Sequence, residues 1–173
     1  KTNVQIMDVV KMTVSEFKTR VFSESIPRIR KCLDLIDEDD LWESPNVNIT
    51  SIGCSIQHVA GNARQWILSG LIGEKDVRER NNEFQYNNDV KKLGLSTLLD
   101  TLESDLTQRL DVLDADILDA QFEIQGFSVS GFSALIHVIE HFSYHTGQIT
   151  LLAKFYTGAS TDYYDESNLD VRN

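Results

Sequence analysis

Three of the chain's four histidines, His137, His141 and His145, lie in one stretch at four-residue intervals. That stretch, Gly131–Phe155, contains no proline, and its apolar residues recur at three- and four-residue steps, which predicts an amphipathic helix of about 24 residues. Residues four apart on a helix are neighbours, with roughly 5–6 Å between Cβ atoms, a spacing that lets two imidazoles bind one cation. The spacing therefore indicates a divalent-metal site, and the alternative is a helix with scattered histidines that bind nothing.

The helical phase of these histidines separates them into an inward pair and a spare. With about 100° per residue and His141 set to zero, the apolar residues centre near 90°, His145 falls at about 40° and His137 at about −40°. His145 therefore lies inside the edge of the buried arc, His141 lies on its boundary, and His137 lies further toward solvent. This geometry favours His141 and His145 as the metal ligands.

A third imidazole comes from a second predicted helix, which extends from about Ser51 to Leu71. His58 lies on its polar face, so it reaches a metal only if another helix or a loop covers that side. Three neutral imidazoles leave at least one coordination position open, as a catalytic Zn²⁺, Ni²⁺ or Fe²⁺ requires. An ion with an open position lowers the pKa of bound water or holds a thiol as thiolate.

Two other kinds of metal site compete for the same histidines. A ferritin-like di-iron bundle needs Glu-x-x-His pairs, and no histidine here has a glutamate three residues before it. The segment His137-Val-Ile-Glu140-His141 matches the inverted zinc-protease signature, in which Glu140 would act as the base. That signature needs an acidic ligand downstream, where Glu166 is the sole glutamate, and Glu140 lies at about −100°, away from the buried arc. The three-histidine site is therefore preferred.

The remaining pattern predicts two further helices and their connections. Thr13-Val-Ser-Glu16 fits a capping box at the start of a helix that extends to about Ile36, and Pro27 is expected to kink or split this helix. A leucine seam marks another helix, from Ser96 or Thr97 to about Leu113, and short alternation over 117–129 predicts an extended crossover or a small hairpin. Four amphipathic helices with a long second connection are typical of an all-α, antiparallel four-helix bundle.

The long connection, Gly73–Gly94, has little periodicity, and a loop of this length in a compact domain is often functional. Arg78, Arg80 and Glu83 are its candidate site residues, which would shape a pocket or hold the loop against the body. The polar, acidic tail, 158–173, is expected to be loosely held. The chain is therefore predicted to be a single domain, 1–173, with a core of about residues 13–157.

Composition limits the partners of the chain. The 173 residues carry 16 lysines and arginines against 27 aspartates and glutamates, a formal charge of −11, which disfavours binding to nucleic acid. No apolar run approaches the roughly 20 residues of a membrane span, and no signal peptide is visible. Cys32 and Cys54 form no CxxC motif, and two free thiols suit a reducing cytoplasm.

Three motifs together resemble the DinB/YfiT-like metalloenzyme superfamily, and within it a branch of bacterial proteins. They are His58-x-x-Gly61-Asn62, Arg78-x-Arg80-x-x-Glu83-Phe84 and His141-x-x-x-His145-x-Gly147-Gln148. The likeness covers most of the chain, from about residue 13 to residue 157. It implies a DinB-like four-helix bundle, a divalent metal (Zn, Ni or Fe) on His58, His141 and His145, and a homodimer, as in many members.

Members with known activities include bacillithiol S-transferases and the mycothiol-dependent maleylpyruvate isomerase, in which the metal activates a low-molecular-weight thiol. The resemblance therefore implies a metal-dependent thiol S-transferase or hydrolase that acts on a small-molecule substrate. The alternative is a non-enzymatic bundle that binds metal structurally or serves as a dimeric interaction module. Cys54 lies one turn before His58 and is expected to be a neighbour in the pocket wall, because the superfamily pattern does not require it.

Overall fold

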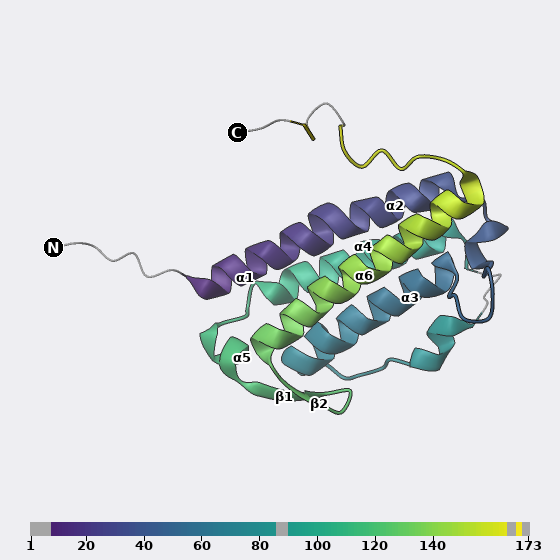
Figure 1. The fold of residues 1–173 in the computed structure, drawn as a ribbon. Coiled ribbons are helices and arrows are strands. Elements are labelled where there is room, and N and C mark those ends of the chain that lie inside the picture. Colours follow the sequence, from purple (N-terminus) through teal and green to yellow (C-terminus); the bar gives the residue numbers. More distant parts are fainter. Residues whose placement is uncertain (1–7, 86–89, 166–168, 171–173) are drawn as a thin grey trace.

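Four long helical stretches dominate the computed structural model, which describes residues 8–85, 90–165 and 169–170. Figure 1 shows these stretches side by side, with a small two-stranded hairpin at one end. The final helix, α6 (Gly131–Thr157), packs against both the first and the second stretch, and the second packs in turn against the third. The fold is therefore mostly helical, with α6 packed against the first and second stretches and α4 packed against α3, η3 and α2.

The first stretch comprises α1 (Val9–Phe17), a π-helical segment η1 (Lys18–Ser25) and α2 (Ile26–Leu35). Its start was predicted at Thr13, and this prediction is wrong, because Asp8 caps the helix by accepting a hydrogen bond from the Lys11 amide. Thr13 instead lies inside α1, where its hydroxyl donates to the Val9 carbonyl at 2.8 Å.

Pro27 does not break this stretch. It lies in the first turn of α2, where a proline is tolerated, and Ser25 and Ile26 keep helical backbone angles. The wider π-helical turns of η1 come directly before it, and the Ser25 hydroxyl donates to the Arg20 carbonyl at 2.8 Å. The helix is therefore not split at Pro27. Its type changes instead, from π-helix in η1 to α-helix in α2.

The second stretch comprises α3 (Ile52–Ala63) and another π-helical segment, η3 (Arg64–Leu71), which confirms the predicted helix. Ser51 caps it by accepting a hydrogen bond from the Cys54 amide at 3.2 Å. A single 3₁₀ turn, η2 (Asp40–Trp42), lies in the connection before it.

The connection after the second stretch contains a 3₁₀ turn, η4 (Arg80–Phe84), which packs along α3. This loop therefore has structure of its own, although residues 86–89 lie outside the described part of the chain. Helix α4 (Lys92–Leu110) begins earlier than the predicted Ser96 or Thr97. The Glu38 carboxylate accepts hydrogen bonds from the Lys92 amide, a partner that the local sequence does not reveal.

The predicted leucine seam is buried at Leu99, Leu102, Leu106, Leu110 and Leu113, whereas its first member, Leu98, is half-buried and Leu95 is buried in addition. A short helix, α5 (Ala115–Asp119), then leads to strands β1 (Gln121–Ile124) and β2 (Phe127–Ser130). The strands pair antiparallel with Gln121 opposite Ser130, which confirms a hairpin in the predicted crossover. Gln125 and Gly126 form its turn with φ values of 53° and 79°.

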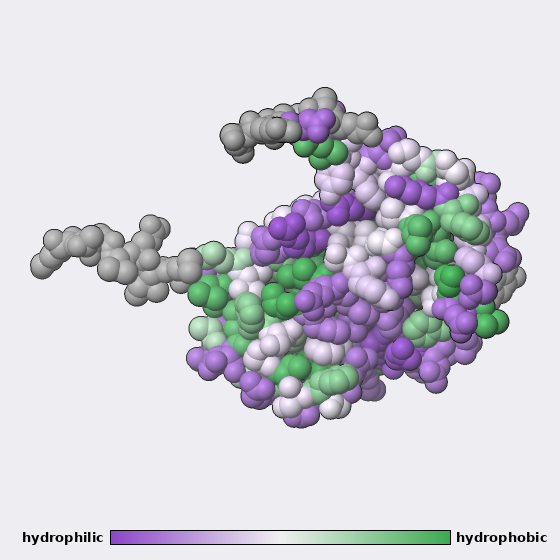
Figure 2. Space-filling model, viewed as in Figure 1, coloured by the Kyte–Doolittle hydropathy of each residue, from purple (hydrophilic) through white to green (hydrophobic). Residues whose placement is uncertain are grey.

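Helix α6 confirms the long amphipathic helix predicted around the three histidines. Ser130 caps its start by accepting from the Ser133 amide, and Gly158, at φ 65°, ends it. Figure 2 shows mixed polar and apolar surface, with apolar area over the C-terminal part of α6. Among the described residues, no helix is both long enough and apolar enough to cross a membrane.

The start of the tail is docked against the body, so the expectation of a loosely held tail is wrong for this part. Thr161 is buried, and the Tyr163 hydroxyl lies 2.7 Å from Thr150 Oγ1 on α6. Lys31 Nζ donates to the Asp162 carbonyl at 2.9 Å. An aromatic ring and one buried threonine are sufficient to anchor a segment whose average composition is polar. Residues 166–168 and 171–173 lie outside the described part of the chain.

Candidate metal centre

Three imidazoles, those of His58, His141 and His145, meet between α3 and α6. His58 Nε2 and His145 Nε2 each lie 3.2 Å from His141 Nε2. One nitrogen from each of the three rings falls within 4.8 Å of the other two. His58 is buried and the other two rings are half-buried. We call these three residues the histidine triad.

The elements around the triad explain why the polar face of α3 is buried. His141 and His145 stand one turn apart on α6, and His58 projects from α3, which packs against both α6 and η4. The Phe84 ring of η4 lies 4.9 Å from the His58 ring, and the Arg80 guanidinium lies 4.9 Å from the centre of Phe84. The loop thus supplies the cover that His58 needs.

Glu83 connects this loop directly to the triad. Its Oε2 accepts a hydrogen bond from His58 Nδ1 at 2.9 Å. Arg78 Nε donates to Glu83 Oε1 at 2.6 Å, and Arg78 Nη2 donates to Oε2 at 2.8 Å. Arg78 Nη1 also donates to Gln65 Oε1 at 2.8 Å. Metal-binding histidines are commonly held by a carboxylate on their other ring nitrogen, and Glu83 occupies that place.

The charge of Glu83 is maintained by its two partners. Burial alone would raise its pKa, but the hydrogen bonds from Arg78 and His58 together lower the pKa below the ordinary value. Glu83 is therefore an ionised carboxylate at neutral pH, and the Arg78 guanidinium neutralises it. A buried ion pair whose acid also holds an imidazole is an arrangement suited to fixing one ring in one orientation.

Gly61 makes this arrangement possible. It lies three residues after His58 on α3, beneath the Arg78–Glu83 pair. A Cβ atom at this position would overlap Glu83 Oε1 and lie 3.2 Å from Arg78 Nε. The absence of a side chain at residue 61 therefore allows the carboxylate to approach the helix closely enough to reach His58.

The tautomers available to the three histidines suit a bound cation better than they suit hydrogen bonds among the three rings. Glu83 only accepts hydrogen bonds, so Nδ1 of His58 carries the proton and its Nε2 presents a lone pair. His141 Nε2 faces both neighbours at 3.2 Å, but one proton there can be donated well to only one of them. A tetrahedral cation about 2.0–2.1 Å from each nitrogen needs nitrogen separations of about 3.4 Å. The donor set therefore fits a divalent ion.

His141 and His145 are also uncharged at neutral pH, as metal ligands must be. Burial, together with the neighbouring His145 and His58, lowers the pKa of His141 to about 3. Burial and the neighbouring His58 lower the pKa of His145 to about 4. Neutral imidazoles do not have to lose protons before they bind a cation, so binding does not compete with protonation near neutral pH.

Acidification should destabilise the metal-free protein below about pH 6.5. The unfolded chain takes up protons on these histidines near their ordinary pKa of 6.5, whereas the folded pKa values are about 3 for His141 and about 4 for His145. Between these values the unfolded state binds more protons, so the free energy of unfolding falls as the pH falls. Thermal melts of metal-free protein from about pH 7 to pH 4.5 measure this loss. A His141→Gln/His145→Gln double variant should melt with a shallower pH dependence, and equal slopes would contradict the assignment.

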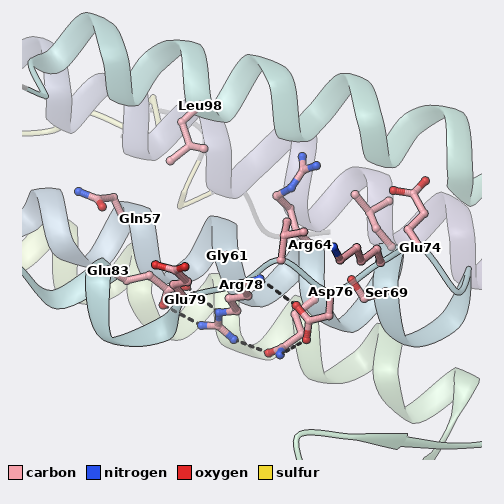
Figure 3. A pocket seen from close by; sticks show the side chains of 14 residues that line it. Gln57, Gly61, Arg64, Ser69, Glu74, Asp76, Arg78, Glu79, Glu83 and Leu98 are labelled. Carbon is pink, nitrogen blue, oxygen red and sulfur yellow. Dashed lines mark hydrogen bonds and ion pairs between the residues drawn. The ribbon is translucent and has the colours of Figure 1, made fainter.

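A cavity of about 270 Å³ borders the Arg78–Glu83 pair. Figure 3 shows it between α3, η3, the following loop and α4, with Arg78 bonded to Glu83 near Gly61 and with Leu98 above. The triad histidines do not line this cavity. It therefore lies beside the site and shares with it Arg78 and Glu83, together with Gly61 and Gln65, which position that pair.

Comparison with known proteins shows the family to which this chain belongs. The model of the family described as "Protein of unknown function (DUF1572)" matches residues 9–163. The chain belongs to the DUF1572 family. Comparison with curated proteins gives no match.

Two solved structures resemble this DUF1572 chain in fold. The crystal structure of a DinB-like protein from Bacillus subtilis, YjoA, has a TM-score of 0.63 and 16% identity, over 86% of this chain and 94% of that one. A DinB-like protein from Bacillus cereus ATCC 10987 has a TM-score of 0.57 and 19% identity, over 83% and 93% of the two chains. The DUF1572 chain therefore has a DinB-like fold, as its motifs predicted.

The other candidate residues of the DUF1572 chain lie outside the triad. His137 stacks on Trp66, with ring centres 3.7 Å apart, and it does not belong to the cluster of possible ligands. Glu140 is exposed, and Glu166 lies outside the described residues, so the zinc-protease reading gains no support. Cys54 is buried with its thiol directed to the Gln85 carbonyl at 3.9 Å, and it does not belong to the cluster of possible ligands.

Sequence reasoning on the DUF1572 chain gave no role to Gly61, Gln65 or Trp66. The structure gives each of them a role. Gly61 leaves space for the Glu83 carboxylate, Gln65 accepts a hydrogen bond from Arg78, and the Trp66 ring stacks on His137. Their spacing carries a signal, because residues 61, 65 and 66 follow His58 within about two helical turns, close to the side that faces the site. The partners of these residues come from the loop and from α6, which the spacing within α3 does not identify.

Proposed function

We propose that the chain is a divalent-metal-dependent enzyme of the DinB type that activates a low-molecular-weight thiol or water for transfer to, or hydrolysis of, a small molecule. The observation that carries this proposal is the number of ligands. In the described part of the chain, the cluster that can hold an ion contains three histidines and no carboxylate or cysteine. Three protein ligands with one position left open are typical of catalytic rather than structural zinc sites.

A bound Zn²⁺, Ni²⁺ or Fe²⁺ would supply the lowered pKa of a coordinated thiol or water. The residues of the chain would set the conditions for that chemistry. Glu83 holds His58 in the tautomer that directs Nε2 to the ion, and Arg78 keeps Glu83 ionised. Phe84 covers His58 and Arg80 lies over Phe84, so the loop limits access of water to this side of the triad.

The test is metal analysis followed by a conjugation screen. Purified protein, as isolated and after loading with Zn²⁺, Ni²⁺ or Fe²⁺, would be assayed for its metal content. The loaded protein would then be incubated with several low-molecular-weight thiols and a chromogenic electrophile, and separately with a chromogenic ester. We expect about one ion per chain and metal-dependent turnover in one of the two assays. The matched control is His145→Ala, which should keep its fold and lose turnover.

A non-enzymatic role is the second candidate, and the burial of the site favours it. His58 is only 8% exposed, so access to the triad is limited on its side. A structural ion predicts full loading, a large loss of stability on chelation and no turnover in either assay. Protein that binds no divalent ion even after reconstitution would remove the enzyme and the structural ion, and would leave a dimeric interaction module as the non-enzymatic role.

We also propose a cytoplasmic homodimer built on an antiparallel four-helix bundle. Support for the dimer comes from Tyr144, Leu151 and Phe155, which lie on one side of α6 and are 64%, 69% and 68% exposed. Support for the compartment comes from Cys32 and Cys54, which are both free. Light scattering should give twice the 19.6 kDa chain mass, and a Leu151→Glu/Phe155→Glu variant should give the monomer mass. A wild-type monomer at high concentration would exclude the dimer.

A further inference from the structure

A second polar pair lies one helical turn from the triad. Asn62 follows His58 by four residues on α3, and His137 precedes His141 by four residues on α6. Asn62 Nδ2 donates to His137 Nε2 at 3.4 Å, just as His58 meets His141 one turn away. The two helices therefore run antiparallel here, and the Asn62–His137 pair forms the next level of the same interface, about 6 Å along the helix axis.

The Asn62–His137 pair is held in place by Trp66 and the hairpin turn. The His137 ring stacks on Trp66, with 3.7 Å between centres and 24° between planes. The Trp66 indole nitrogen donates to Gln125 Oε1 in the hairpin turn at 3.1 Å. His137 also faces the His141 ring at 5.5 Å. The hairpin, Trp66 and His137 thus form a rigid support that fixes the position of the Asn62 amide.

The carbonyl half of that amide is unpaired in the described part of the chain. Asn62 is 4% exposed, and its Oδ1 is buried without a hydrogen bond to any described residue. A buried carbonyl oxygen left unpaired loses its hydrogen bonds to water and is destabilising, so a leucine of similar shape would be the more stable choice at this position if only packing mattered. Oδ1 of Asn62 is thus an unpaired acceptor one helical turn away from the contact between His58 and His141.

We propose that Oδ1 of Asn62 accepts a hydrogen bond from a hydroxyl or amine of the small molecule held at the triad, which makes Asn62 a specificity-determining residue. His137 and Trp66 act as positioning residues for it. This inference rests on the proposed function, since it requires an occupied triad. The molecule selected is a small thiol, or another small metal ligand, with a hydrogen-bond donor two carbons away from the atom held at the triad. Such a molecule spans the distance of about one helical turn between the two levels.

The test uses Co²⁺-loaded protein and two thiols of nearly equal shape, 2-mercaptoethanol and 1-propanethiol. Only the first carries a donor. The charge-transfer absorption of cobalt thiolate reports binding directly, without any turnover. For the wild type we expect 2-mercaptoethanol to bind up to about tenfold more tightly than 1-propanethiol, the effect of one hydrogen bond. Asn62→Leu should bring the ratio of the two affinities close to one, whereas Asn62→Asp, which keeps an acceptor oxygen, should retain a preference.

The ratio of the two thiol affinities distinguishes recognition of the ligand by Asn62 from a purely structural role of Asn62. A merely structural role for Asn62 would weaken both thiols equally and leave their ratio unchanged in Asn62→Leu, and that result overturns the inference. Equal affinities in the wild type overturn it as well, while cobalt and thiol binding leave the proposed function standing. A wild-type protein that binds no cobalt overturns the proposed function, and the inference with it. If Asn62→Leu does not fold, His137→Phe, which preserves the stack on Trp66 and removes the partner of Asn62, should also lower the ratio.

Discussion

Replacement of His141 by alanine should lower the affinity for a divalent cation by roughly 100- to 1,000-fold. His141 Nε2 is the central atom of the triad, because it lies 3.2 Å from both of the other Nε2 atoms. Structural zinc sites with four ligands bind with about 10–16 kcal/mol, so the loss of one ligand costs about 3–4 kcal/mol. The remaining pair, His58 and His145, would bind an ion only weakly. Competition with a chromogenic chelator measures the change for Zn²⁺ and Co²⁺.

His137→Ala is the matched control for this experiment. His137 belongs to the same helix, is one turn from His141, and is also half-buried, but it lies outside the cluster of possible ligands. Its removal should change cation affinity by less than about tenfold. If His137→Ala loses as much affinity as His141→Ala, the ion is held by a different set of histidines, and the choice of His58 as the third ligand is wrong.

The part of the site that local sequence could predict is the part contained in a single helix. His141 and His145 share a turn of α6, and their four-residue spacing indicated that they can bind one ion. The helical phase placed His137 toward solvent, and that prediction is wrong, because His137 is half-buried against Trp66. The starts of α3 and α6, predicted at about Ser51 and at Gly131, were equally visible, because a start signal and its helix are adjacent in the chain. Each of these inferences needs only 3.6-residue periodicity and neighbouring residues.

The remainder of the site depends on which segments cover which faces, and periodicity contains no such information. His58 lies on a polar face that becomes interior only because η4 and α6 pack against it. Glu83 comes from a loop whose order depends on Arg78 and Gln65, two partners from different elements. The start of α1 was misplaced for a simpler reason: both Asp8 and Thr13 are acceptable caps, and the apolar pattern did not decide between them.

Replacement of Gly61 by alanine should produce the second large effect, a loss of cation affinity of about 10- to 100-fold without any change to a ligand. The new Cβ would overlap Glu83 Oε1 and lie 3.0 Å from its Cδ, so the carboxylate must retreat from α3. Retreat removes the hydrogen bond from His58 Nδ1 and with it the fixed tautomer of the ring. It also disturbs a buried ion pair, so the free energy of unfolding should fall by about 1–3 kcal/mol although alanine is the better helix former.

Two companion variants decide whether the effect of Gly61→Ala passes through Glu83. Gly147→Ala places the same substitution in α6, where a Cβ meets nothing within 4 Å, and should raise stability by about 0.5–1 kcal/mol with unchanged cation affinity. Glu83→Gln removes the charge that holds His58 and should itself lower the affinity about 10- to 100-fold. Both changes act on one contact. The Gly61→Ala/Glu83→Gln double variant should therefore lose little more cation affinity than the single variant with the larger loss. Additive losses, measured by the same chelator competition, would mean that Gly61 affects the triad by another route.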